Sequence, residues 1–149
     1  MRIISKILAT FFGLGYFPLA PGTLTSLVMV IIYKFFLFKL TWPLHLILFF
    51  LLFLVGSFVS TNYSAALNKK DPQKIVIDEA CGQYLALFQL TPSWLFVGLS
   101  FLLFRFFDII KPFPLKRVEL FPHGWGIMLD DVAAGLYAGI ITYIFLLVK

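Results

Sequence analysis

Charged residues are scarce in this chain of 149 residues: Asp, Glu, Lys and Arg together make up 13% of it, whereas hydrophobic residues make up 61%. Soluble domains are usually about 25% charged and about 45–50% apolar. A soluble monomer of this length leaves much of its surface in water and needs more polar residues to cover it. The composition therefore excludes an ordinary soluble domain and a disordered chain. It favours an integral membrane protein with one domain, residues 1–149.

Cysteine is almost absent. The single cysteine, Cys81, excludes an intrachain disulfide and a multi-cysteine metal site, and its small and apolar neighbours indicate a packing role. Leu87 stands where the phosphate-binding loop of a cysteine phosphatase has an arginine. The chain also lacks a Walker loop, the Asp-x-Asp motif of haloacid-dehalogenase phosphatases, and the motifs of histidine-based lipid phosphatases and CDP-alcohol phosphotransferases.

Apolar runs are what the sequence has in abundance. They cover about residues 23–38, 42–60, 80–90, 94–107 and 132–148. A spanning helix needs roughly 17–25 residues, so the second and the last run are long enough alone. The third and fourth runs, separated by Thr91-Pro92-Ser93, are better explained as a short helical hairpin. We therefore expect an all-α, polytopic helical bundle with about four to five membrane-embedded helices.

The charges are distributed unevenly along the chain. The formal net charge is +5, but the basic residues lie thinly spread between apolar runs, which favours anionic lipid headgroups over nucleic acid as the partner. With a cytoplasmic N-terminus, the positive-inside rule leaves outside only Lys34, Lys39 and Lys149 of the twelve basic residues. All seven acidic residues then fall inside as well. We therefore expect a polar site at the cytoplasmic face.

Five of these acidic residues stand at the ends of predicted helices. They are Asp78, Glu79, Asp108, Asp130 and Asp131. The helix dipole favours carboxylates at helix starts, which is enough to explain four of them, but it disfavours Asp108 at a helix end. Five carboxylates brought together by packed helices would repel one another, and a hard cation such as Mg²⁺ would relieve the repulsion. Simple helix-start carboxylates and a metal site are both compatible with the spacing.

Two further segments are candidates for phosphate binding. Arg105, Asp108 and Lys111 recur at intervals of three, which places them on one face of a helix, either as a charge ladder or as cations that bind phosphate oxygens. The loop before Thr23 is rich in glycine and proline, so its backbone can approach a ligand closely. Thr23 itself is predicted to cap the first long helix.

Three blocks of sequence are similar to one known family. They are Pro21-Gly-Thr-Leu-Thr-Ser26, Ile75-Val-Ile-Asp-Glu-Ala-Cys-Gly82, and Phe104-Arg-Phe-Phe-Asp-Ile-Ile-Lys-Pro112 followed by Gly126-Ile-Met-Leu-Asp-Asp-Val-Ala-Ala-Gly135. With these blocks and their spacing, the chain resembles the phosphatidylglycerophosphatase A family of bacterial inner-membrane lipid phosphatases.

The resemblance implies Mg²⁺-dependent hydrolysis of phosphatidylglycerophosphate to phosphatidylglycerol and phosphate, at the cytoplasmic face of the bacterial inner membrane. By position, it assigns metal-binding and catalytic roles to the five acidic residues named above. It assigns phosphate binding to Arg105, Lys111, Thr23 and Ser26.

Two alternatives stay open. One is a phosphatase of the same family with another phosphomonoester substrate. The other is a small membrane transport or assembly protein without enzymatic activity. A transport path places ionisable groups at mid-membrane depth, and here only Lys34 is a clear case. The gathering of charges at one face therefore favours interfacial chemistry.

Overall fold

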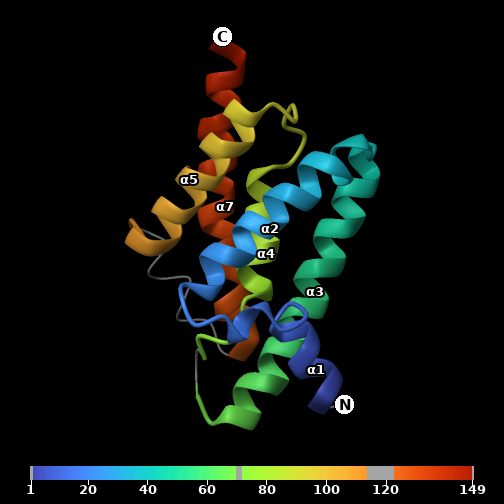
Figure 1. Cartoon of the computed structure of the whole chain (residues 1–149), viewed down its shortest axis with the longest axis vertical. Helices are drawn as coiled ribbons and strands as arrows, with labels where there is room; N and C mark the ends of the chain where they lie inside the picture. The colour runs from blue at the N-terminus through green and yellow to red at the C-terminus, as the bar shows by residue number, and fades with distance from the viewer. Residues whose placement is uncertain (1, 70–71, 114–122, 149) are drawn as a thin grey trace.

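The structure, a computed structural model, describes residues 2–69, 72–113 and 123–148. Its α-helices are α1 (Arg2–Ala9), α2 (Pro21–Phe35), α3 (Trp42–Leu67), α4 (Ile77–Ala86), α5 (Trp94–Ile110) and α7 (His123–Val148) (Figure 1). Two short 3-10 helices, η1 (Leu14–Tyr16) and η2 (Leu37–Lys39), join the first three. No strand occurs in these three ranges, so the predicted all-α fold is confirmed for them. Five charged residues of the topology prediction lie outside the ranges: Lys70, Asp71, Lys116, Arg117 and Glu119, together with Lys149 at the end.

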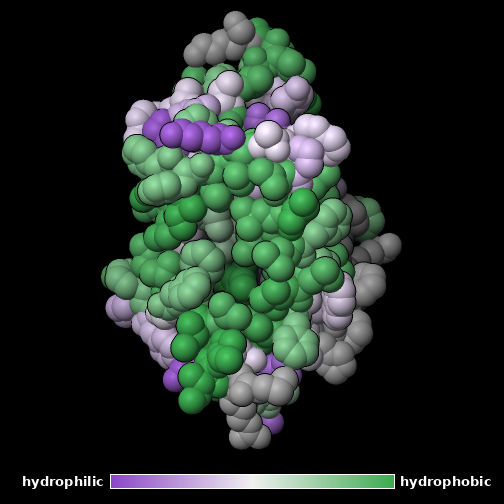
Figure 2. Space-filling view, turned by 90° about the vertical axis from the view of Figure 1, so that its right-hand side faces the viewer, coloured by the Kyte–Doolittle hydropathy of each residue, from purple (hydrophilic) through white to green (hydrophobic). Residues whose placement is uncertain are grey.

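Two helices are long and apolar enough to cross a membrane. They are Trp42–Leu67 and Gly124–Val148, with mean hydropathies of 2.3 and 1.9. Many large apolar side chains on them are exposed, among them Phe50, Leu54 and Phe58 of α3. Figure 2 shows the result on one face, where hydrophilic residues lie above and below a broad apolar middle. The chain is therefore a membrane protein.

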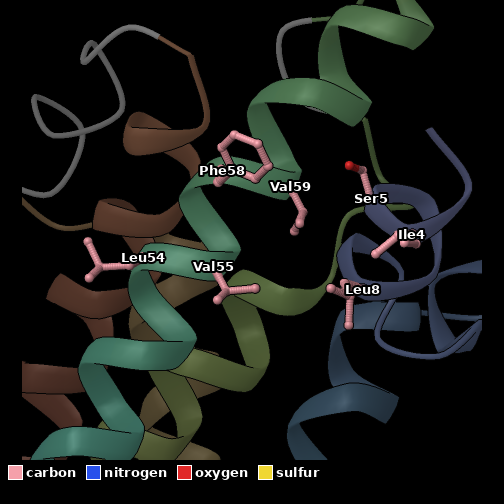
Figure 3. A pocket seen from close by; sticks show the side chains of 7 residues that line it. All are labelled: Ile4, Ser5, Leu8, Leu54, Val55, Phe58 and Val59. Carbon is pink, nitrogen blue, oxygen red and sulfur yellow. The ribbon is translucent and has the colours of Figure 1, made fainter. Parts of the chain in front are cut away.

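An apolar groove of about 370 Å³ opens between α1 and α3 (Figure 3). Its walls are formed by Ile4 and Leu8 on one side and by Val55, Phe58 and neighbouring residues of α3 on the other. Ser5 is its one polar lining residue, and none of the predicted site residues reaches it. Such an apolar surface is suited to contact with the hydrocarbon chains of a bilayer. The described residues that line the groove include no charged side chains for catalysis.

The most extensive helix contact joins α4 to α7, near the middle of the molecule in Figure 1. A Cβ atom at Gly135 of α7 would lie only 2.2 Å from the carbonyl oxygen of Gly82 in α4. One at Gly82 would lie 2.5 Å from the carbonyl oxygen of Asp131. Small residues let helices in a membrane approach this closely. Cys81, beside Gly82, is fully buried, which confirms its predicted packing role.

Helix α2 begins earlier than the sequence predicts. Its N-cap is Ala20, and Thr23 lies inside the first turn, so the prediction that Thr23 caps this helix is wrong. The physical reason is Pro21, whose fixed φ suits the first helical position and whose missing N–H costs nothing there.

Helix α7 also begins earlier, at His123, so Asp130 and Asp131 lie about two turns inside it instead of opening it. Gly124 and Gly126 lie in the first turn, and glycine is a poor helix former. The sequence pattern therefore predicts a helix start at Asp130, later than the observed one. Tertiary contact overrides the propensity: the backbone N–H of Gly124 donates to Thr61 Oγ1 of α3 at 2.9 Å. The helix dipole at a helix start therefore does not explain why Asp130 and Asp131 stand where they do.

Gly135→Ala is expected to lower the free energy of unfolding by about 1–3 kcal/mol, because its methyl group would be forced into the Gly82 carbonyl. The control is Gly98→Ala in α5, where a Cβ atom would meet nothing within 4 Å. That variant should be neutral, or more stable by about 0.5–1 kcal/mol. Thermal unfolding in detergent measures both. Equal melting temperatures for the two variants would contradict the tight α4–α7 contact.

Candidate active site

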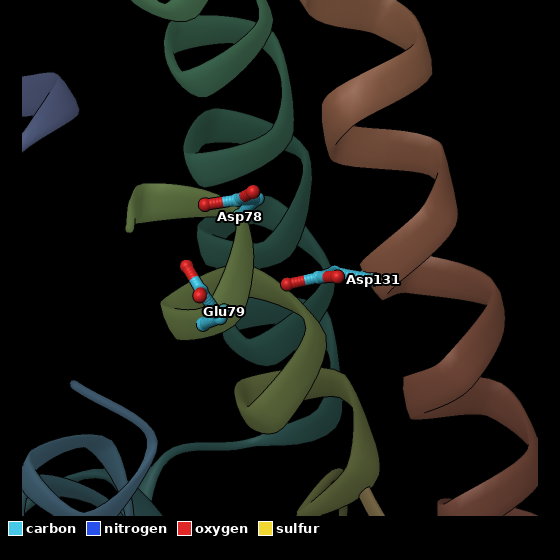
Figure 4. A group of neighbouring side chains, drawn as sticks. All are labelled: Asp78, Glu79 and Asp131. Carbon is cyan, nitrogen blue, oxygen red and sulfur yellow. The ribbon is translucent and has the colours of Figure 1, made fainter. Parts of the chain in front are cut away.

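Three carboxylates meet between α4 and α7. Asp78 and Glu79 stand in the first turn of α4, and Asp131 projects from α7 toward them (Figure 4). One oxygen of each lies within 4.8 Å of the others. Asp78 and Asp131 are buried, with 8% and 4% of their surface exposed. The first turn of a helix favours negative charge, but the α4–α7 contact is what brings Asp131 beside it.

A second group shares Asp131 with the first. One oxygen each from Asp108, Asp130 and Asp131 also lies within 4.8 Å of the other two. Asp108 comes from the last turns of α5, and the other two come from α7. All five predicted acidic residues are therefore brought together from three helices, as two overlapping groups.

Two cations border the carboxylates. Arg105 Nη1 lies 2.6 Å from Asp108 Oδ2, one turn apart on α5. Lys111 forms an ion pair with Asp130. The prediction that Lys111 shares a helical face with Arg105 and Asp108 is wrong, because Lys111 is the C-cap of α5 and has a φ of 47°. This left-handed residue ends the helix, and the lysine pairs with α7 instead.

The cluster carries more negative charge than these two cations balance. Glu79 Oε2 and Asp131 Oδ2 are buried without a hydrogen-bond partner among the described residues, an arrangement that is costly inside a protein. Burial, and then the negative charge of Asp108, raise the pKa of Glu79 to about 7. Carboxylate oxygens are the ligands that hard divalent cations prefer. The donor set therefore fits a Mg²⁺-type ion.

The start of α2 packs directly against this cluster. A Cβ atom at Gly22 would lie 1.9 Å from Glu79 Oε1, so only glycine leaves the carboxylate in place. The predicted approach of this loop to a ligand stays a prediction; the structure places its end against Glu79. Thr23 is half-buried in the same turn, and the fully buried Ser26 donates its hydroxyl to the carbonyl of Gly22 at 2.9 Å. A phosphate-binding role for Thr23 and Ser26 stays a prediction.

The contact of Gly22 with Glu79 was missed by the sequence reasoning. The Pro21-Gly22 pair shows that the chain can turn into a helix there, but not which side chain lies opposite. The same is true of Gly82, whose packing partner lies about fifty residues further along the chain.

Buried carboxylates beside an arginine and a lysine, in a bundle with two helices long enough to cross a membrane, can hold a metal ion and bind phosphate oxygens, as a membrane phosphatase requires. Comparisons with known proteins also identify a phosphatase. The sequence matches the family model of phosphatidylglycerophosphatase A over residues 7–146. The chain belongs to the phosphatidylglycerophosphatase A family, as its motifs indicate, and is a phosphoric monoester hydrolase.

Three curated relatives are similar over most of their length. A phosphatidylglycerophosphatase A of Haemophilus influenzae is 39% identical over 92% of this chain and 85% of its own. One of Escherichia coli is 34% identical over 93% of this chain and 81% of its own. A Bacteroides thetaiotaomicron protein with the provisional name phosphatidylinositol-3-phosphatase is 36% identical over 91% of this chain and 89% of its own. No solved structure matches the chain.

Gly22→Ala is expected to lower kcat by about a hundredfold, the cost of displacing a site group by roughly 1 Å. Its methyl group would push the end of a flexible side chain, Glu79, so the melting temperature should change little. Phosphate release from a phosphomonoester and thermal unfolding together check this. Wild-type kcat in the variant would show that the position of Glu79 does not matter for turnover.

Proposed function

We propose that this protein hydrolyses the terminal phosphate of phosphatidylglycerophosphate, with Mg²⁺ bound by the carboxylate cluster, at the cytoplasmic face of a bacterial inner membrane. The printed names of the Haemophilus influenzae and Escherichia coli relatives support the substrate. The observation that carries the proposal is the meeting of five carboxylates from three helices around Asp131.

The carboxylates would hold one or two ions. Asp78 and Glu79 offer oxygens on one side of Asp131, while Asp108 and Asp130 offer them on the other. Bound Mg²⁺ supplies Lewis-acid chemistry: it polarises the phosphoryl group and lowers the pKa of a bound water. The buried oxygens of Glu79 and Asp131 that lack a hydrogen-bond partner are the natural ligands.

The chain's own cations would bind the phosphoryl group that is removed. Arg105 and Lys111 are each held beside one carboxylate, Asp108 and Asp130, which fixes where their remaining N–H groups can reach. Donors fixed in advance stabilise the charge that develops on phosphoryl oxygens without reorganising during the reaction. Thr23, in the first turn of α2, would add the free backbone N–H and partial positive charge of a helix start, and Ser26, one turn later, its hydroxyl group. A carboxylate of the cluster would serve as base or nucleophile.

The membrane arrangement follows from the same groups. In our proposal α2, α4 and α5 are embedded beside the spanning helices α3 and α7, which gives five embedded helices, within the four to five expected from the sequence. The start of α4 and the end of α5 carry the cluster to one membrane face. The positive-inside rule makes this face cytoplasmic, since most basic residues flank it.

A transport role is less well supported. Lys34, the one ionisable residue expected at mid-membrane depth, hydrogen-bonds to the carbonyl oxygen of Pro92. Its ammonium group also lies 4.2 Å from the ring centre of Trp94. Lys34 thus joins the end of α2 to the turn before α5. Lys34 is not part of a continuous path for ions, because it lies in the last turn of α2 and the carboxylates lie beside the first turn of the same helix.

Asp131→Asn and Asp108→Asn should each lower kcat for phosphate release by at least about a hundredfold, because each removes a charged ligand of the cluster. Excess EDTA should abolish the wild-type activity, and added Mg²⁺ should restore it. Activity of either variant within a few-fold of wild type would overturn the assignment of the cluster. Full activity in EDTA would contradict the proposed dependence on Mg²⁺, independently of the result for the two variants.

A panel of lipid phosphomonoesters tests the substrate. Phosphatidylglycerophosphate should have a higher kcat/KM than phosphatidate, lysophosphatidate or phosphatidylinositol 3-phosphate, measured as phosphate release in mixed micelles. A preference for phosphatidylinositol 3-phosphate would instead give this chain the activity in the name of its Bacteroides thetaiotaomicron relative.

A further inference from the structure

Two lysines and two tyrosines gather outside the carboxylate cluster. The ammonium groups of Lys6 and Lys74 lie 5.3 and 5.1 Å from the centre of the Tyr16 ring. The Tyr16 hydroxyl lies 2.8 Å from that of Tyr63, at hydrogen-bond distance. These four residues, here called the lysine–tyrosine cluster, come from α1, η1, α3 and the segment before α4. They are 68 positions apart at their extremes, so tertiary structure alone brings them together.

Backbone contacts fix the lysine–tyrosine cluster in place. A Cβ atom at Gly15 would lie 2.0 Å from the carbonyl oxygen of Lys74, so the loop around η1 touches the main chain of the segment that carries this lysine. The backbone N–H of Val76 donates to the carbonyl oxygen of Ala9 at 2.9 Å, which ties the same segment to the end of α1. The segment that carries Lys74 is therefore held against both the loop of Tyr16 and the end of α1, the helix that carries Lys6.

Among the described residues, no carboxylate pairs with the lysines of this cluster, Lys6 and Lys74. Two cations that share one aromatic ring repel each other, and each keeps N–H donors for an acceptor. The hydrogen bond with Tyr63, next a hydrogen bond with Lys6, and then the charges of the two lysines lower the pKa of Tyr16, against the opposing effect of its burial. An anion bound here would relieve the repulsion.

The surroundings of the cluster indicate the depth of lipid headgroups. Exposed apolar side chains border it on the same loop: Phe12, Phe17 and Leu19 are 75%, 46% and 76% exposed. Aromatic residues beside lysines are typical of the interface between bilayer and water. Helix α1, the loop with η1 and the start of α4 also lie in the same lower part of the molecule in Figure 1.

The lysine–tyrosine cluster lies close to the carboxylates along the chain. Lys74 precedes Asp78 by four residues, which span at most about 14 Å even when fully extended. The loop with η1 makes the same connection, since Gly15 touches Lys74 and Gly22 touches Glu79. In phosphatidylglycerophosphate, only one glycerol unit separates the terminal phosphate from the phosphodiester. Two phosphates of one lipid can therefore occupy neighbouring sites.

We propose that the lysine–tyrosine cluster binds the phosphodiester of the substrate while the carboxylate cluster acts on its terminal phosphate. This inference rests on the proposed function and adds a specificity site to it. Lys6 and Lys74 donate charge-assisted hydrogen bonds to the phosphodiester oxygens, and the Tyr16–Tyr63 pair holds the ring between them. Phosphatidate, which has a phosphomonoester but no phosphodiester, gains nothing from this site.

The test compares Lys6→Gln, Lys74→Gln and the double variant with Lys39→Gln. Lys39 is a matched control because it is exposed and also lies over an aromatic ring, 5.7 Å from the centre of Phe38, between α2 and α3. For phosphatidylglycerophosphate in neutral detergent micelles, each lysine variant should raise KM about tenfold, the loss of one charge-assisted hydrogen bond. The kcat should not change. For phosphatidate, and for Lys39→Gln with either lipid, KM should stay at the wild-type value.

Direct binding makes the test independent of turnover. Both lipids are titrated onto Asp131→Asn protein with and without the lysine substitutions, and only phosphatidylglycerophosphate should bind about tenfold more weakly to the lysine variants. Equal losses for both lipids would overturn the proposal and make the lysines general membrane anchors. An effect that appears only when phosphatidylglycerol is added would overturn it in favour of a neighbouring lipid. Failure of the proposed function looks different, since wild-type protein would then not hydrolyse phosphatidylglycerophosphate at all.

Discussion

The close approach of α4 to α7 is the constraint on which the rest of the structure depends. Gly82 and Gly135 have no side chains, so the two backbones come near enough for the main chain of Asp131 to touch α4. The carboxylate of Asp131 is then fixed beside Asp78 and Glu79. In a membrane, helices gain little from hydrophobic burial against one another, and packing of small residues takes its place. The same contact thus stabilises the bundle and aligns the site.

The bundle, in turn, places its acids where they are costly. Buried carboxylates without partners destabilise a fold unless a cation or a protonation change compensates. Arg105 and Lys111 compensate one side of the cluster through Asp108 and Asp130, whereas Glu79 and Asp131 keep uncompensated oxygens on the other. In the proposed function, this asymmetry would leave Arg105 and Lys111 for the phosphoryl group, and the oxygens of Glu79 and Asp131 that lack a partner would be free to bind a metal ion.

The sequence alone predicted the helical class and the two helices long enough to cross a membrane, because hydropathy is a local pattern. It indicated that the five acids meet, because all of them stand near helix ends and the family resemblance assigns them to one site. It failed where a particular contact between helices decides the local structure. The bonding of Gly124 to Thr61 starts α7 two turns earlier than glycine content indicates. The left-handed turn at Lys111 redirects that lysine to Asp130, which a helical spacing rule cannot foresee. The Gly22–Glu79 contact was invisible for the same reason, since no local signal names a partner in another helix.

The loop with η1 connects the two charged regions. Gly15, in this loop, packs on the main chain of Lys74, and Gly22, in the first turn of α2, packs on the side chain of Glu79 in α4. A Cβ atom at either position would clash with these residues. A shift of the segment leading into α4 would move the lysine–tyrosine cluster and the carboxylates together. A soluble phosphatase can recognise its substrate from all sides, but an enzyme at a bilayer surface meets a lipid headgroup in one orientation. In our proposal, a loop that is packed at both ends and spaces the lysine–tyrosine cluster from the carboxylate cluster suits that restriction, because the lipid would present its two phosphates at fixed depths.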